Sequence, residues 1–191
     1  MKIFIGVIFC LISTLTFSQK IAINFKIENE KSIVDYLDGK KLFYNLDDIA
    51  ILKDIKVFSD YGKTERLVVP EAYFFNKEGF LLKNKNKGVG CGASIKNLSK
   101  ILKSKFDTNQ QIKNWLKDYQ MLGNTASSSD VYDIYVLINW AIFLDSNNET
   151  SFNWYTSLKN NKELKIKVLL INLDVQETWQ LTDKQKEFLG V

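Results

Sequence analysis

Histidine is absent from the 191 residues of this chain, and arginine and proline each occur once, at Arg66 and Pro70. Without histidine there can be no Ser-His-Asp or Cys-His catalytic arrangement and no histidine-ligated metal site. Acid–base chemistry would fall to Asp, Glu, Lys or Tyr, and no pair of carboxylates stands out by its spacing. We therefore assign no catalytic residue, no metal and no cofactor, and we expect binding rather than catalysis.

The positive charge of the chain is carried by lysines that are spread along the sequence. The formal net charge is +4, from 26 basic and 22 acidic residues. Nucleic-acid binding proteins usually concentrate their basic residues and use arginine for bidentate contacts. The composition therefore argues against nucleic acid as a partner.

Residues 1–18 have the pattern of a secretory signal peptide. Lys2 precedes an apolar run at residues 3–12, and a polar stretch with small residues follows it. We expect cleavage before Gln19, export to the periplasm or the outside of the cell, and no stable membrane insertion of the mature chain. The apolar run is about half the length that a membrane anchor needs.

Cys91 is then the one cysteine of the mature chain, because Cys10 lies within the signal peptide. One cysteine cannot form an intramolecular disulfide, so we expect the core alone to stabilise the fold. Residues 19–191 are long enough for a single compact domain. A segment with linker composition, residues 123–130, joins two parts at residues 19–122 and 131–191.

The first part contains a clear β-hairpin signal. Apolar and aromatic residues 68–75 and 80–82 flank a turn that contains Gly79. Lys83, Lys85 and Lys87 follow, and we interpret them as a solvated strand edge. A glycine cluster comes next, but its spacing does not match a dinucleotide-binding loop. The other expected elements are strands at 21–27, 42–44 and 55–58 and helices at 31–37, 95–106 and 109–122.

The second part alternates apolar runs with amphipathic segments. We expect buried strands at 132–143 and 167–173, a loop at 144–148, and helices at 149–158 and 182–189. Asp174 follows the second of these strands, at a position where α/β proteins often place site residues. The alternation predicts an α/β fold with at least one parallel strand pair.

The second part resembles the first half of a thioredoxin-like domain, with its buried strand, active-site loop, helix and second strand. The segment NWAIFLDSNNE, residues 139–149, resembles the strand end and the loop. The first part is similar to the other half of the family, with Val69 and Pro70 before an aromatic strand. The halves occur in reverse order. The resemblance implies a three-layer sandwich around a mixed central sheet, in which the Val69–Pro70 bond is cis. It also implies a circular permutation, in which the linker joins the family's original C-terminus to its original N-terminus.

The resemblance also implies where a ligand binds. The two cysteines of the family's redox motif would correspond to Leu144 and Asn147, so dithiol exchange is lost at that loop. The groove between residues 144–147 (Leu144, Asp145, Ser146 and Asn147) and Val69–Pro70 would remain. In the family this groove receives an extended polypeptide, and such capture by backbone pairing needs no cysteine. We therefore expect non-catalytic binding of a peptide or partner protein.

Two alternatives remain open from the sequence. Cys91 lies before an expected helix, whose amides would lower the pKa of its thiol, so the protein could be a monothiol redox protein. The chain could also be a structural or interaction protein with an unrelated α/β fold. Reaction of the thiol with a maleimide separates the first alternative from peptide binding.

Overall fold

A computed structural model describes residues 25–123 and 131–191 of the chain. The expected signal peptide and most of the expected linker lie outside the described residues. The strands are β1 (Ile27–Glu28), β2 (Ile49–Leu52), β3 (Glu71–Asn76), β4 (Phe80–Leu82), β5 (Phe106–Gln111), β6 (Tyr119–Met121), β7 (Ile134–Trp140), β8 (Ile166–Asn172) and β9 (Val175–Gln176). The helices are α1 (Glu30–Gly39), α2 (Ile55–Lys63), α3 (Cys91–Ile95), α4 (Leu98–Ile101), α5 (Ile112–Trp115), α6 (Asp145–Lys159) and α7 (Asp183–Leu189).

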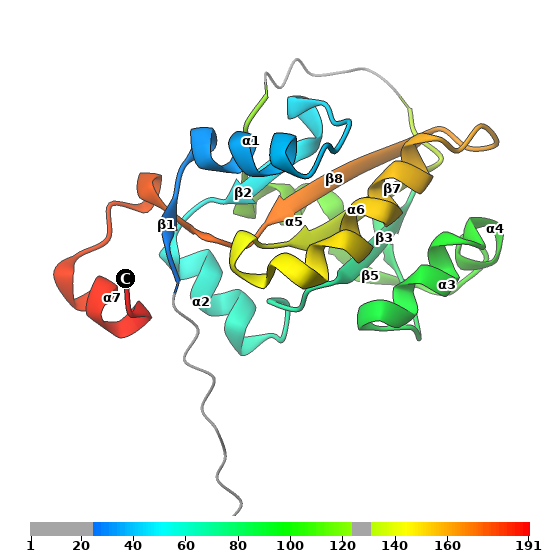
Figure 1. The fold of residues 1–191 in the computed structure, drawn as a ribbon. Helices are drawn as coiled ribbons and strands as arrows, with labels where there is room; N and C mark the ends of the chain where they lie inside the picture. The colour runs from blue at the N-terminus through cyan, green and yellow to red at the C-terminus, as the bar shows by residue number, and fades with distance from the viewer. Residues whose placement is uncertain (1–24, 124–130) are drawn as a thin grey trace, which may run out of the picture.

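A mixed seven-stranded sheet forms the centre of the molecule, in the order β5-β4-β3-β7-β8-β2-β6 (Figure 1). Strand β7 pairs parallel with β8 and antiparallel with β3, while β2 pairs parallel with β8. Strands β1 and β9 form a separate parallel pair. The prediction of an α/β fold with parallel strands is confirmed, and strands from both sides of residues 124–130 share one sheet.

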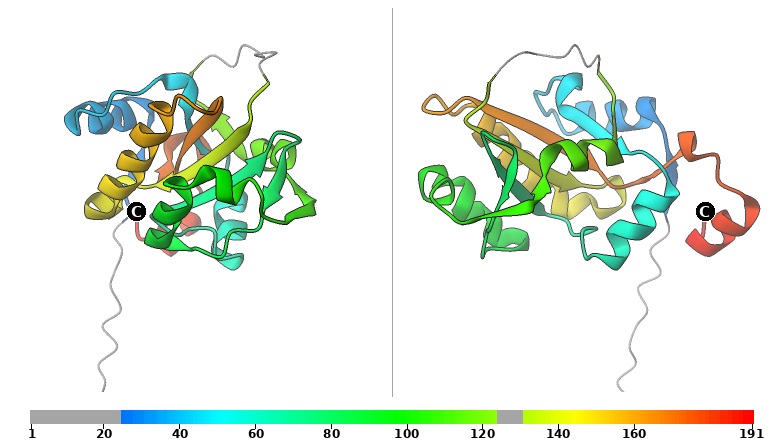
Figure 2. Two further views of the ribbon diagram at one scale, coloured as in Figure 1. Left: turned by 90° about the vertical axis from the view of Figure 1, so that its right-hand side faces the viewer. Right: turned by 180° about the vertical axis from the view of Figure 1, so that it is seen from behind.

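Helices cover both faces of this sheet, as the turned views in Figure 2 show. Helices α1, α3, α4 and α6 pack with one set of strand side chains, including Ile138 of β7. Helices α2, α5 and α7 pack with the opposite set, including Leu137. Successive residues of a strand face opposite sides, so a largely apolar strand such as β7 supplies both cores.

The β-hairpin and two buried strands were predicted close to their observed positions. Strands β3 and β4 form the hairpin, and Gly79 has the positive φ of 82° that its turn requires. Helices α1 and α7 also occur where we expected them. Each begins with a capping box, from Asn29 to Ser32 in α1 and from Thr182 to Gln185 in α7.

Four predicted elements of the first part are wrong. Residues 55–58 begin helix α2, because Asp54 caps it and Phe58 and Tyr61 share its buried face. Residues 42–44 form no strand. The predicted helix at 95–106 is interrupted at Asn97, whose side chain caps α4. The predicted helix at 109–122 contains only the short α5 and a 3-10 turn at Leu116–Asp118, because the flanking residues pair with β4 and β2.

Candidate functional site

Three segments meet at the carboxyl ends of the parallel strands β7 and β8. The register pairs Trp140 with Asn172 at these ends, and it pairs Asn139 with Glu71, the first residue of β3. Pro70 therefore lies one residue beyond, level with the end of β7. This end of a parallel sheet is where α/β proteins commonly bind ligands. The polar groups found there hold the backbone in place, as described below.

Asn139 holds the segment that precedes Pro70. Its side chain is buried in β7, and its Nδ2 atom donates to the carbonyl oxygens of Arg66 at 2.9 Å and Val68 at 3.1 Å. The Ser151 hydroxyl of α6 donates to the carbonyl oxygen of Asn139 at 2.7 Å. The Val69–Pro70 bond is cis, as the resemblance implied. The chain before β3 is thus tied directly to the central strand.

Val69 has an unused pair of backbone hydrogen-bonding groups. Neither its N–H nor its carbonyl oxygen makes a hydrogen bond to any residue in the ranges 25–123 and 131–191. Its side chain is half-buried and packs against the same core cluster as Leu144, while Val68 beside it is 39% exposed. Backbone groups of folded proteins are nearly always paired, with protein or with water. An extended chain could pair with these groups.

Asn148 anchors the start of the loop after β7. The residue is fully buried on α6, its Oδ1 accepts from the Ala141 N–H at 3.1 Å, and its Nδ2 donates to the Ala141 carbonyl oxygen at 2.7 Å. The same Nδ2 also donates to the Tyr36 hydroxyl oxygen at 2.8 Å. Residues 148–150 match an N-glycosylation sequon, but a buried Asn148 with these bonds is no acceptor for a glycan.

Asp174 anchors the next two residues of the loop. Its carboxylate accepts from the N–H groups of Ile142 at 2.7 Å and Phe143 at 3.4 Å, and from Asn172 Nδ2 at 2.5 Å. Burial raises the pKa of Asp174 to about 6, against the lowering effect of these donors. The buried Glu28 adds a further, smaller rise. Asp174, whose place after a strand suggested a site residue, therefore uses its carboxylate to hold the loop in place.

The predicted binding residues 144–147 do not form a loop. Residues Ile142–Leu144 make one 3-10 turn, and α6 then begins at Asp145, four residues earlier than predicted. Asp145 accepts from the Tyr36 hydroxyl at 2.6 Å and pairs with Lys40 at 2.6 Å, and these two contacts lower its pKa. Ser146 and Asn147 are exposed on the first turn of the helix. The structure thus brings 144–147 to the same end of the sheet as Pro70.

Cys91 does not have the environment of a reactive thiol. It is fully buried, and its Sγ lies 3.0 Å from Glu71 Oε1 and 3.4 Å from the carbonyl oxygen of Asn86. Burial and then the hydrogen bond to Glu71 raise its pKa to about 12. The expectation of a lowered pKa is therefore wrong, because the thiol points into the core rather than toward solvent at a helix start.

The sequence contained an overlooked signal for part of this site. Asn139 and Asn172 each follow a Leu-Ile pair near the end of a buried, mainly apolar strand. A buried amide in such a run needs hydrogen-bond partners, and these come from neighbouring segments. The partners themselves, Arg66 and Val68 for Asn139, lie more than seventy residues away along the chain.

Metal binding and membrane insertion would each require a specific feature within residues 25–123 and 131–191. No three His, Cys, Asp or Glu side chains gather there in a way that could hold a metal ion. No helix in these ranges is both long and apolar enough to span a membrane. Comparisons of the chain with models of protein families, with curated proteins and with solved structures find no match.

Proposed function

We propose that the protein is an exported, thioredoxin-like protein that lacks a dithiol site and binds an extended polypeptide without catalysis. The proposal is carried by Val69, whose backbone N–H and carbonyl oxygen have no hydrogen-bond partner within residues 25–123 and 131–191, at the end of the sheet where the loop after β7 lies. An extended segment can add to such groups as an extra strand would, so that main-chain hydrogen bonds supply affinity.

The strand order supports the thioredoxin-like part of this proposal. Strands β4-β3-β7-β8 are neighbours, with β7 and β8 parallel and β3 antiparallel to both β7 and β4. A permuted domain of that family would have this arrangement, with the β3–β4 half earlier in the chain. Helix α6 connects β7 to β8 and packs on the same face as α3 and α4.

The chemistry of the site supports binding rather than exchange of thiols. By the resemblance, Leu144 and Asn147 would correspond to the family's cysteines, and the thiol of Cys91 is buried with a raised pKa. The loop is held by Asn148 and Asp174, and the segment before Pro70 by Asn139. Binding to groups already in place costs less conformational entropy than binding that must order a loop.

A selection of phage-displayed random peptides on the purified protein tests this function. Synthetic versions of selected peptides are titrated by calorimetry into the protein and into the V69P variant, which lacks one unpaired N–H. We expect the peptides to bind the unaltered protein and to bind V69P at least about tenfold more weakly. The variant loses one main-chain hydrogen bond to the peptide, and its proline ring also changes the shape of the site. The matched control is V131P, at a site that is 74% exposed and outside every helix and strand.

Two outcomes contradict the proposal. If no peptide is enriched on the folded protein, the site does not bind extended polypeptides. If the enriched peptides bind V69P as tightly as V131P, they bind elsewhere. The backbone amide signal of Val69 in a nitrogen–proton spectrum gives an independent measurement, since it must shift when a peptide pairs with it.

The monothiol alternative has its own test. With a pKa of about 12 the folded protein contains almost no Cys91 thiolate at pH 7. We expect a maleimide reagent to leave the native protein unlabelled over an hour and to label it within minutes in denaturant. Rapid labelling of the native protein would favour a redox role for Cys91 instead.

A further inference from the structure

One stretch of the chain has basic residues and no acidic ones. Residues 79–106 contain seven lysines and neither Asp nor Glu, which leaves 19 basic against 22 acidic residues in the rest of the chain. The seven are Lys83, Lys85, Lys87, Lys96, Lys100, Lys103 and Lys105. The fold gathers this segment into β4, the following loop, α3, α4 and the start of β5. The excess positive charge is therefore local.

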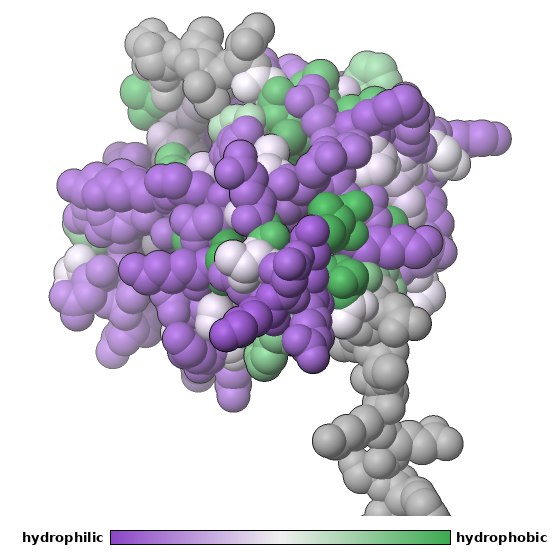
Figure 3. Space-filling model, turned by 90° about the vertical axis from the view of Figure 1, so that its left-hand side faces the viewer, coloured by the Kyte–Doolittle hydropathy of each residue, from purple (hydrophilic) through white to green (hydrophobic). Residues whose placement is uncertain are grey.

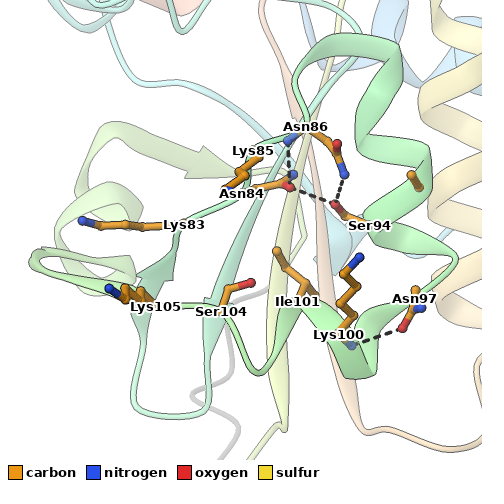
Figure 4. A pocket seen from close by; sticks show the side chains of 11 residues that line it. Lys83, Asn84, Lys85, Asn86, Ser94, Asn97, Lys100, Ile101, Ser104 and Lys105 are labelled. Atoms are coloured by element: carbon orange, nitrogen blue, oxygen red, sulfur yellow. Dashed lines mark hydrogen bonds between the residues drawn. The ribbon is translucent and has the colours of Figure 1, made fainter.

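Four of these lysines line a hollow of about 660 Å³ between the end of β4 and helices α3 and α4 (Figure 4). Lys83 and Lys105 extend from neighbouring segments, since the Lys83 N–H donates to the Lys105 carbonyl oxygen at 2.7 Å. Lys85 lies two residues further along, and Lys100 lies on α4 across the hollow. No acidic side chain contributes to the lining.

The ammonium groups of these lysines have no anionic partner within residues 25–123 and 131–191. Some lysines elsewhere form ion pairs, such as Lys40 with Asp145 and Lys167 with Asp48. No such pair is found for the four lysines of the hollow. Like charges gathered at one place repel each other, so an anionic ligand would be stabilised there.

Three polar residues that line the hollow are hydrogen-bonded to one another. Asn84 Oδ1 accepts from the Asn86 N–H at 3.1 Å and from the Ser94 hydroxyl at 2.8 Å, and Asn86 Nδ2 donates to Ser94 Oγ at 3.0 Å. These bonds join the loop that follows β4 to Ser94 of α3 (Figure 4). The ammonium groups are the charged groups of the lining that remain to meet a ligand.

The hollow is connected to the site at Val69. The lysine segment runs from the hollow to Gly88, whose N–H donates to Glu71 Oε2 at 2.9 Å. A Cβ atom at Gly88 would lie 3.8 Å from the Pro70 carbonyl oxygen. A chain that passes over Val69 can therefore reach the lysines.

The face of the molecule that carries α7 is mainly hydrophilic, with small scattered apolar areas (Figure 3).

We propose that this lysine-lined hollow binds an acidic segment of the polypeptide partner, through Asp or Glu carboxylates. The identification of the partner as a polypeptide rests on the proposed function. The lysines of the hollow add that the bound segment of this polypeptide is negatively charged. A nucleic acid is the weaker choice, because no arginine and no aromatic side chain lines the hollow to pair with phosphate or stack on bases. Lysine pairs with single carboxylates as a point charge.

The test uses a fluorescein-labelled peptide of twelve alternating Glu and Ser residues, with a Gln-Ser peptide as its uncharged match. Fluorescence anisotropy is measured for the full protein, for a K83Q/K85Q/K100Q/K105Q variant and for a K56Q/K113Q/K162Q/K184Q variant. The control lysines are exposed and lie outside the hollow, and the two variants have equal net charge. Thermal melts check that both variants remain folded.

We expect the acidic peptide to bind the protein and the control variant, and to bind the hollow variant about tenfold or more weakly. Raising the salt from 50 to 500 mM should weaken the binding, and the Gln-Ser peptide should not bind. Equal loss in both variants would overturn the proposal, because net charge alone would then explain the binding. Tighter binding of a twelve-nucleotide single-stranded DNA, lost in the hollow variant, would replace the peptide by nucleic acid.

The V69P variant separates failure of this inference from failure of the proposed function. If selected peptides need Val69 but bind the hollow variant normally, the site at Val69 stands and the hollow carries no acidic segment. If the acidic peptide needs the four lysines but not Val69, the hollow stands and the backbone-pairing site fails.

Discussion

Asp48 and Asp174 are both buried carboxylates, each with 2% of its residue exposed, but their partners differ in charge. Asp48 receives Lys159 and Lys167, each at 2.8 Å, and the Tyr155 hydroxyl at 2.9 Å. The Asp174 carboxylate accepts hydrogen bonds only from backbone and side-chain amides, and it forms no ion pair within residues 25–123 and 131–191. One buried charge is neutralised and the other is not.

The pKa values of the two groups move in opposite directions for this reason. Burial opposes ionisation at Asp48, but the hydrogen bonds and charges of Lys159 and Lys167 outweigh it and lower the pKa. At Asp174 burial dominates and raises the pKa to about 6. A neutralised charge can tie elements together at little cost, and Asp48 connects the turn before β2 to α6 and β8. A buried charge without a cation beside it costs stability. Asp174 is such a group, and it holds the loop at the end of the sheet where Pro70 lies.

The largest expected effect comes from removing the charge of Asp48. D48N leaves two ammoniums beside a neutral amide, and we expect a loss of about 3 kcal/mol in the free energy of unfolding at pH 7. Urea denaturation measures it. D35N is the control, because Asp35 forms an exposed pair with Lys31 on α1 and should change stability by less than about 0.5 kcal/mol.

The pH dependence at Asp48 has a definite sign. Its folded pKa is lower than the unfolded value, so its contribution is present above about pH 4 and lost as the pH falls below that. A D48N protein with unchanged stability at pH 7 would show that the lysines contribute nothing through this carboxylate.

Asp174 should give the opposite dependence. Its folded pKa of about 6 exceeds the unfolded value of about 4, so its contribution is full below pH 4 and is lost as the pH rises through 6. We expect about 2–3 kcal/mol of stability to disappear over this window, measured by urea denaturation at intervals between pH 4 and 8. D174N should remove that dependence while D35N keeps it. Identical pH profiles for D174N and the unaltered protein would contradict the raised pKa.

The smallest effect sharpens the comparison from the Asp48 side. Y155F removes one neutral donor from Asp48 and leaves both lysines, so we expect a loss of about 1 kcal/mol. The same urea titration measures it. A loss as large as that of D48N would mean that the hydroxyl, rather than the two ammoniums, stabilises the buried charge.

Several elements could be predicted because local pattern and tertiary role agree. Strands β7 and β8 are apolar on both faces, as buried parallel strands are, and the hairpin of β3 and β4 has its glycine at the turn. Strands β5 and β6 were missed. Their residues have polar or helical spacing, but their backbone groups complete the ladders of β4 and β2.

The candidate site was predictable only in part. The sequence placed Pro70, residues 144–147 and Asp174 near strand ends, and all lie at the same end of the sheet in the structure. It did not indicate that Asp145–Asn147 would be helical, since α6 begins without a side-chain cap and its first residue contacts another element. The hydrogen bond from Tyr36 to Asp145, for example, joins residues 109 positions apart.

The sequence by itself determined the absence of histidine chemistry, the single cysteine after residue 18, the α/β class and the local excess of lysines. Each of these depends on composition or on short-range pattern. Only the tertiary structure decided that Cys91 is buried against Glu71. It also decided that, among the described residues, the backbone groups of Val69 have no partner and Asp174 has no cation beside it. Desolvation and hydrogen bonding depend on neighbours distant in the sequence, which the register of β3, β7 and β8 brings together.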